Sequence, residues 1–165
     1  MNTLNLENIN KKSPYEVVLI EGSSSIFYFI TDYNVEYEIV IKANDIFIPS
    51  GAYVLDIINV WNDKSPGDYK IKQTLQAIIE EFFLQDNEAL LYVTETKDKK
   101  QAFRNRLFVR WFNTYDNHDK YLIRTAEGKM NNQMNFIAII MRKDNPRKEM
   151  IINEFDETVR FLFDL

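Results

Sequence analysis

A long amphipathic segment between two apolar segments most strongly limits what this 165-residue chain can fold into. Along residues 71–83, apolar residues recur at spacings that place them on one face of an α-helix for more than three turns. They are Ile71, Leu75, Ile78, Ile79, Phe82 and Phe83. Residues 53–61 and 89–94, on either side of this helix, are apolar and typical of strands. We therefore expect two parallel neighbouring strands joined by a right-handed crossover.

An antiparallel meander is predicted before this unit. Residues 15–20, 26–31 and 35–41 are rich in aromatic and β-branched residues and are separated by turn residues, which is typical of strands. In the third of these segments, Glu36 and Glu38 alternate with apolar residues. The alternation predicts a strand with one exposed side.

The C-terminal half is predicted to contain a second helix, a hairpin and a last helix. Residues 97–115 supply the second helix, and residues 121–126 and 135–141 form the hairpin around a loop at 127–134. Asn145 and Pro146 are typical of a helix start. The expected buried stripe of the last helix comprises Met150, Ile151, Ile152, Phe155, Val159 and Leu162. The fold class is thus α/β with a mixed α+β sheet, in the order β-β-β-β-α-β-α-β-β-α.

The length and composition indicate one folded domain over residues 1–165. The content of 45% hydrophobic and 14% aromatic residues is typical of a globular protein. Residues 1–13 are polar, and we expect a loose lead-in there. The chain has no cysteine, which excludes disulfides and thiol nucleophiles.

The charge and hydropathy patterns limit the classes of partner and compartment. The net charge of −5 disfavours nucleic-acid binding, because an acidic protein repels phosphates unless a local basic surface prevails. No apolar run reaches about 18 residues, and the first residues lack the apolar core of a secretory signal. We therefore expect a cytoplasmic protein without a membrane segment.

The element order from residue 53 onward, β-α-β-α-β-β, resembles the core of the GNAT N-acetyltransferase fold. In that family a glycine-rich turn, Arg/Gln-x-x-Gly-x-Gly/Ala, holds the pyrophosphate of acetyl-CoA through backbone amides, and residues 64–73 are the corresponding place. Here Lys70 and Lys72 stand where the glycines would fall. Their charge suits a pyrophosphate, but their side chains obstruct its close approach. The resemblance implies acetyl-CoA as a cofactor and leaves open whether the protein is an enzyme.

Several short strings look like a small bacterial family of unknown function. They are residues 27–32 (FYFITD), residues 37–39 (YEI), the arginine-rich run 104–112 and residues 142–146 (RKDNP). The similarity covers most of the chain from about Tyr15. It assigns no catalytic residue.

A basic stretch before and along the second predicted helix is the candidate ligand site. The candidate anion-binding residues are Lys97, Lys99, Lys100, Arg104 and Arg106. At 100° per residue, Arg104 falls in the middle of the helix's apolar arc, whereas Arg106 falls on its flank. A guanidinium on an apolar face needs a carboxylate, carbonyl groups or an anionic ligand, because an unpaired buried charge is costly.

Two hypotheses for Arg104 stay open. It pairs internally with a carboxylate of Glu36, Glu38, Asp56 or Glu95, or it anchors an anion pocket together with the three lysines. Arginine geometry suits a carboxylate or a phosphate.

The remaining chemical groups indicate no catalytic or metal centre. His118 is the only histidine, so we expect no metal site. Glu80 and Glu81 are predicted on the polar side of the first helix. The tyrosines are numerous enough for some to be exposed, and an exposed aromatic sheet face would mark a protein partner.

The function that the sequence favours is a non-catalytic binding or protein-interaction domain with a small basic anion-binding corner. The expected partner is a protein or a small anionic ligand, a homodimer is compatible with the sequence, and no cofactor is expected. The alternative is a GNAT-like N-acetyltransferase that uses acetyl-CoA through an atypical pyrophosphate loop.

Overall fold

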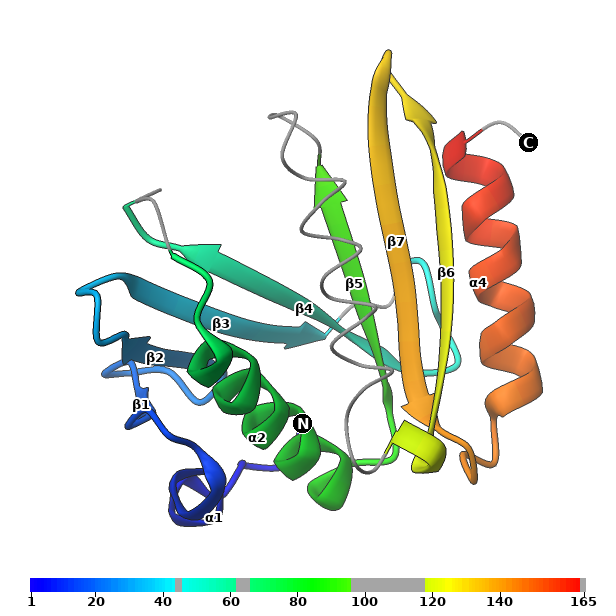
Figure 1. Cartoon of the computed structure of the whole chain (residues 1–165). Coiled ribbons are helices and arrows are strands. Elements are labelled where there is room, and N and C mark those ends of the chain that lie inside the picture. The colour runs from blue at the N-terminus through cyan, green and yellow to red at the C-terminus, as the bar shows by residue number, and fades with distance from the viewer. Residues whose placement is uncertain (44–45, 62–65, 96–117, 164–165) are drawn as a thin grey trace. The chain divides into compact units, whose positions relative to one another are not determined.

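The computed structural model describes residues 1–43, 46–61, 66–95 and 118–163 (Figure 1). The helices are α1 (Leu6–Lys12), α2 (Tyr69–Gln85) and α4 (Lys148–Phe163), with a short 3-10 turn at His118–Lys120. The strands are β1 (Val18–Leu19), β2 (Ile26–Ile30), β3 (Glu36–Ala43), β4 (Ala52–Asn59), β5 (Ala89–Glu95), β6 (Tyr121–Met130) and β7 (Gln133–Arg142). They belong to a seven-stranded mixed sheet with the order β1-β2-β3-β4-β5-β7-β6. The predicted fold class and element order are confirmed, while the helix predicted at 97–115 lies outside the described residues.

The chain divides into two compact units. Unit 1 comprises Met1–Lys42 and Leu55–Asp86, and unit 2 comprises Ala43–Val54 and Asn87–Leu165. The prediction that the whole chain forms one domain stays a prediction.

In unit 1, β1, β2 and β3 form an antiparallel meander with one buried side. Phe27 and Phe29 of β2 are fully buried, and they alternate with residues that are not. The Phe29 ring stacks between two tyrosines, with ring centroids 5.9 Å from Tyr15 and 5.4 Å from Tyr37. The aromatic stack therefore lies on the buried side of the meander.

The apolar stripe that predicted α2 is confirmed. Ile71, Leu75, Ile78, Phe82 and Phe83 are buried along this helix. The helix begins at Tyr69 because Asp68 caps it, its carboxylate accepting a hydrogen bond from the Lys70 amide at 2.9 Å.

Glu81 corrects the prediction for the polar side of α2. This glutamate is only 3% exposed. Its Oε1 accepts hydrogen bonds from the Asn5 amide at 3.3 Å and from Gln85 Nε2 at 2.9 Å. The prediction was wrong because the N-terminal segment covers this side of the helix, and the sequence does not show that packing.

The expected loose lead-in at residues 1–13 is also corrected, because these residues include α1. Asn5 caps α1 by accepting a hydrogen bond from the Asn8 amide at 3.0 Å. Leu4 and Ile9 are buried, and α1 lies beside α2 (Figure 1). A helix of seven residues is too short to be stable alone, so its stability comes from docking.

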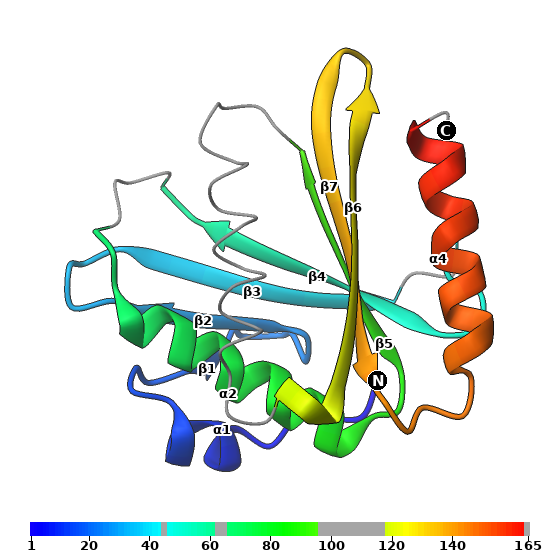
Figure 2. The same ribbon diagram turned by 45° about the vertical axis from the view of Figure 1, so that its right-hand side comes forward.

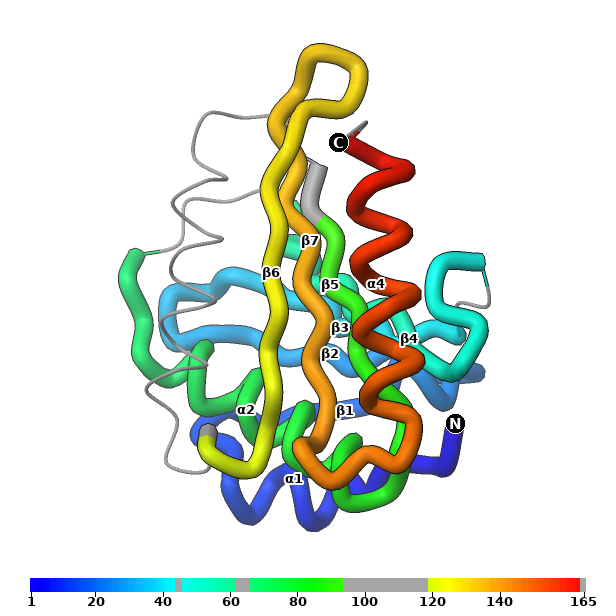
Figure 3. The backbone as a smooth tube through the Cα atoms, turned by 90° about the vertical axis from the view of Figure 1, so that its right-hand side faces the viewer, coloured from blue at the N-terminus to red at the C-terminus, as the bar shows by residue number. Residues whose placement is uncertain are grey.

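Unit 2 is built around β7, which pairs antiparallel with β5 on one side and β6 on the other. Leu91 of β5 lies opposite Ile139 of β7, and both are fully buried. Figure 3 shows α4 alongside these strands, and its Ile151, Phe155 and Phe163 join the same hydrophobic cluster.

The hairpin of β6 and β7 is longer than predicted (Figure 2). The chain reverses at Asn131 and Asn132, which have φ values of 53° and 63°. Asparagine tolerates this left-handed region, which a two-residue hairpin turn of type I′ requires. The predicted loop at 127–134 is therefore wrong, because most of its polar residues continue the two strands.

The start and stripe of α4 differ in detail from the prediction. Asn145 Oδ1 accepts a hydrogen bond from the Arg147 amide at 2.8 Å, and the helix begins at Lys148. Met150 is 57% exposed, whereas Phe163 is buried instead. The predicted burial of Met150 was wrong, because the helix presents the side of Ile151 and Phe155 to the sheet.

Candidate functional site

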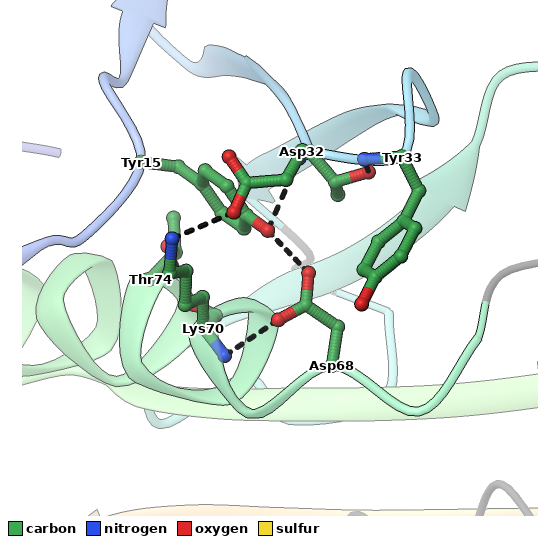
Figure 4. A network of polar contacts seen from close by, with 7 residues as sticks. Tyr15, Asp32, Tyr33, Asp68, Lys70 and Thr74 are labelled. Atoms are coloured by element: carbon green, nitrogen blue, oxygen red, sulfur yellow. Dashed lines mark hydrogen bonds and ion pairs between the residues drawn. The ribbon is translucent and has the colours of Figure 1, made fainter.

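A polar network surrounds the start of α2, where Lys70 was a candidate ligand residue (Figure 4). The Tyr15 hydroxyl donates to the Asp68 carboxylate and accepts from the Asp32 amide at 3.2 Å. Lys70 Nζ lies 2.6 Å from Asp32 Oδ2. Burial, together with the hydrogen bond to Asp68, raises the pKa of Tyr15 to about 12. These polar groups thus interact mainly with one another.

The placement of Lys70 and Lys72 favours a structural role. The Lys70 ammonium is paired with Asp32, and Lys72 is buried with its Nζ 5.1 Å from the centre of the Tyr69 ring. An anion at the start of a helix binds to free backbone amides. Here the Lys70 amide already donates to the Asp68 carboxylate, which caps the helix. The placement of these residues therefore disfavours a pyrophosphate site, and acetyl-CoA binding stays a prediction.

The second side of the unit 1 meander is partly exposed. Tyr28 and Ile30 alternate along β2 with the buried Phe27 and Phe29 and therefore project from the opposite side. Val18 of β1 is paired with Tyr28, and paired residues of an antiparallel ladder project from the same side.

The next two strands extend this side. Glu36 and Glu38 of β3 lie opposite Ile30 and Tyr28, respectively. The Val60 amide donates to the Glu36 carbonyl at 3.0 Å, so Val60 lies opposite Glu36, and Ile58 projects from the same side two residues earlier. We call this surface the outer face. It comprises Val18, Tyr28, Ile30, Glu36, Glu38, Ile58 and Trp61.

A carboxylate between two aromatic side chains marks one part of the outer face. The Tyr28 hydroxyl donates to Glu36 Oε1, and the Trp61 Nε1–H donates to Glu36 Oε2. The hydrogen bond to Glu36 raises the pKa of Tyr28 to about 12, with further contributions from burial and from the charges of both glutamates. Each oxygen of Glu36 thus accepts one aromatic donor.

The two glutamates of the outer face, Glu36 and Glu38, carry negative charge that no ion pair among the described residues neutralises. Asp56, on the same side of β4, is half-buried, and burial raises its pKa while the charge of Lys42 opposes the shift. The surface therefore combines exposed apolar side chains with carboxylates.

A hollow of about 290 Å³ lies in unit 2 between the segment after β3 and the exposed side of α4. Ile46, Phe47 and Pro49 line it from the segment, and Glu157 and Phe161 line it from the helix. Its volume is at the lower limit for small-molecule sites. The described residues of its lining include Glu154 and Glu157 and no cation, which disfavours an anion there.

The predicted anion corner lies outside the described residues. Lys97, Lys99, Lys100, Arg104 and Arg106 all fall in the range 96–117, so the hypotheses about this corner stay predictions. Over the ranges that the structure describes, no three His, Cys, Asp or Glu side chains form a group able to hold a metal ion. Within the same ranges, no helix is both long enough and apolar enough to cross a membrane.

The sequence did not predict that Tyr28 and Trp61 both donate to the Glu36 carboxylate. The alternation of Glu36 and Glu38 predicted an exposed side of β3, and both glutamates are partly exposed, whereas Val40 on the same side is buried. The sequence does not show that β4 brings Trp61, 25 residues later, to the same carboxylate. One signal was available in the sequence. Trp61 lies at the end of a predicted strand, and the strand predicted before it carries Glu36.

Comparison with known proteins identifies a family but no activity. No curated protein and no solved structure matches the chain. The outer face lies before residue 67, so the family match does not bear on it. A family model matches residues 67–157, from the loop before α2 into α4 and more than half of the sequence, and the chain therefore belongs to DUF6169, a family of unknown function.

Proposed function

We propose that this chain is a non-catalytic protein-binding domain whose binding surface is the outer face of unit 1. One observation carries the proposal. Four large apolar side chains on this face are exposed: Val18 by 41%, Ile30 by 45%, Ile58 by 40% and Trp61 by 68%. Grouped exposed apolar residues favour binding, because covering them releases about 25 cal/mol for each Å² removed from water.

The polar groups with catalytic potential support a non-catalytic role. Tyr15, Asp32, Asp68 and Lys70 form bonds with one another around the start of α2. A catalytic acid or base would need a hydrogen bond to a reacting group instead.

The basic corner is a second part of the proposal and rests on the sequence alone. Lys97, Lys99, Lys100, Arg104 and Arg106 would bind a carboxylate or phosphate group of a partner or of a small anion. The absence of cysteine fits a protein of the reducing cytoplasm.

In-cell photo-crosslinking tests the binding surface. A photoreactive phenylalanine analogue replaces Ile58 on the outer face, and in a control protein it replaces Met150, which is exposed on α4. We expect discrete protein adducts from position 58 that disappear when Trp61→Ala is added. Equal adducts from both positions, or adducts that persist with Trp61→Ala, would contradict the proposal.

A thermal-shift measurement tests the enzyme alternative. A ligand that binds only the native state adds RT ln(1 + [L]/Kd) to the free energy of unfolding and thereby raises the melting temperature. We expect no rise with acetyl-CoA at millimolar concentration. A clear rise would favour the acetyltransferase alternative over the non-catalytic role.

A further inference from the structure

We infer that the outer face binds a basic segment of a protein partner and holds a lysine or arginine side chain between the Trp61 ring and the carboxylates of Glu36 and Glu38. This inference rests on the proposed function, because it names the chemistry of the partner for the same surface.

Charge is the first reason. Glu36 and Glu38 project from the same side of β3, about 7 Å apart along the strand. No described lysine or arginine forms an ion pair with either of them. Like charges on neighbouring positions of one face repel each other, so a cation placed between them relieves the repulsion.

The geometry of Glu36 is the second reason. Tyr28 and Trp61 each donate one hydrogen bond to a different oxygen of this carboxylate. An ionised carboxylate has about four acceptor positions, so two remain for the donors of a partner. The two aromatic bonds also fix the position of the charge before a partner arrives, which lowers the entropy cost of binding.

The Trp61 ring is the third reason. Its Nε1–H lies in the plane of the ring, so the bond to Glu36 does not use the π face. The side chain is 68% exposed. Tryptophan is the best aromatic partner for a cation, and a nearby carboxylate adds to the attraction.

The apolar residues around the two glutamates indicate a polypeptide rather than a small cation. Val18, Ile30 and Ile58 are each exposed by at least 40%. They suit the aliphatic stem of a lysine or arginine and the apolar residues beside it in an extended segment. A small polyamine would leave most of this surface in water.

A binding assay with defined peptides tests the inference on the full chain. The probe is a fluorescein-labelled extended peptide of alternating lysine and valine, followed by fluorescence anisotropy. Peptides that replace lysine by glutamate or by serine are the comparison probes. We expect the lysine peptide to bind. Added salt should weaken this binding, because salt screens charges near the surface.

Four variants locate the effect. Glu38→Gln should weaken binding of the lysine peptide about fivefold, because one carboxylate charge is lost. Trp61→Leu keeps an apolar side chain but removes the π face, and it should weaken binding about fivefold as well. Tyr28→Phe removes one donor to Glu36 and should have a smaller effect. Glu149→Gln, an exposed glutamate of α4, is the charge-matched control and should bind like the unchanged protein.

The results separate this inference from the proposed function. Equal binding of the lysine and serine peptides overturns the inference about charge but supports a protein-binding face. Unchanged binding by Glu38→Gln also overturns it. A melting temperature that falls by several degrees in Glu38→Gln would show that a cation of the chain itself already neutralises this carboxylate, and it would overturn the inference too. Stabilisation by acetyl-CoA instead favours the enzyme alternative over the proposed function.

Discussion

Replacing Gly128 by alanine would place a methyl group inside the packing of α4 on β6. A Cβ at this position would lie 2.3 Å from Cγ and 2.6 Å from Cβ of Phe163. Such atoms do not approach within 3.0 Å, so the ring or the end of the helix must move. The φ angle of Gly128 is not in the left-handed region, so the expected penalty is steric alone.

Two routes relieve the clash, and both give a similar magnitude. If the Phe163 ring stays buried, overpacking costs about 1–3 kcal/mol. If the ring leaves the core, where it is now only 7% exposed, the lost burial costs about 1.5–3 kcal/mol. We therefore expect Gly128→Ala to lower the free energy of unfolding by about 1–3 kcal/mol. For a chain of this size, each kcal/mol lowers the melting temperature by about 2–4 °C.

Thermal and urea unfolding followed by circular dichroism measure this effect. Gly67→Ala is the matched control, because no heavy atom lies within 4 Å of a Cβ at Gly67. It should change the free energy of unfolding by less than about 0.5 kcal/mol. In the double variant Gly128→Ala with Phe163→Ala, Cγ and Cδ2 of Phe163, which would lie 2.3 Å and 2.7 Å from the new methyl group, are absent, so part of the clash is removed and the two effects should not add. Additive effects, or Gly128→Ala as stable as the control, would refute the reasoning.

Three further predictions concern other parts of the fold. The pKa of Tyr28, about 12, lies above the ordinary value of about 10, so its contribution to stability is complete below pH 10 and is lost as the pH rises towards 12. In urea unfolding between pH 10 and 12, the free energy of unfolding should fall less steeply with pH for Tyr28→Phe than for the unchanged protein. Asp68→Ala should lower stability by about 0.5–2 kcal/mol through the lost helix cap, whereas Lys70→Met should leave the unfolding midpoint close to that of the unchanged protein. Asn132→Val places a β-branched residue at a φ of 63° and should cost about 1–2 kcal/mol in thermal unfolding, whereas Asn132→Gly should not.

Regular periodicity explains which elements the sequence predicts well. The apolar stripe of α2 continues over several turns, so the pattern identifies the helix without knowledge of its neighbours. In α1, seven residues with Ile9 as the buried position provide no comparable pattern. The turn at Asn131 and Asn132 is also hard to predict, because asparagine is common in long loops and in tight turns.

Long-range contacts explain why the candidate site was predicted only in part. Lys70 was correctly identified as a cation near the start of α2, but its partner Asp32 lies 38 residues earlier in the sequence. Glu36 and Glu38 were expected on an exposed side of β3, and both are only partly exposed. The aromatic donors around Glu36 come from β2 and from the residue pair after β4, and only the register of the strands brings them together.

The docking of the N-terminal segment on α2 has a consequence for synthesis on the ribosome. Asn5 donates to Glu81, 76 residues later, and Lys12 pairs with Glu80 at 2.7 Å. At a translation rate of about 5–20 residues per second, about 4–15 seconds separate the synthesis of the two partners. During that interval Leu4 and Ile9 have no α2 to cover them. Unit 1 is thus expected to complete its folding only after α2 has left the ribosome, so Leu4 and Ile9, although made before α2, are among the last residues to reach their final positions.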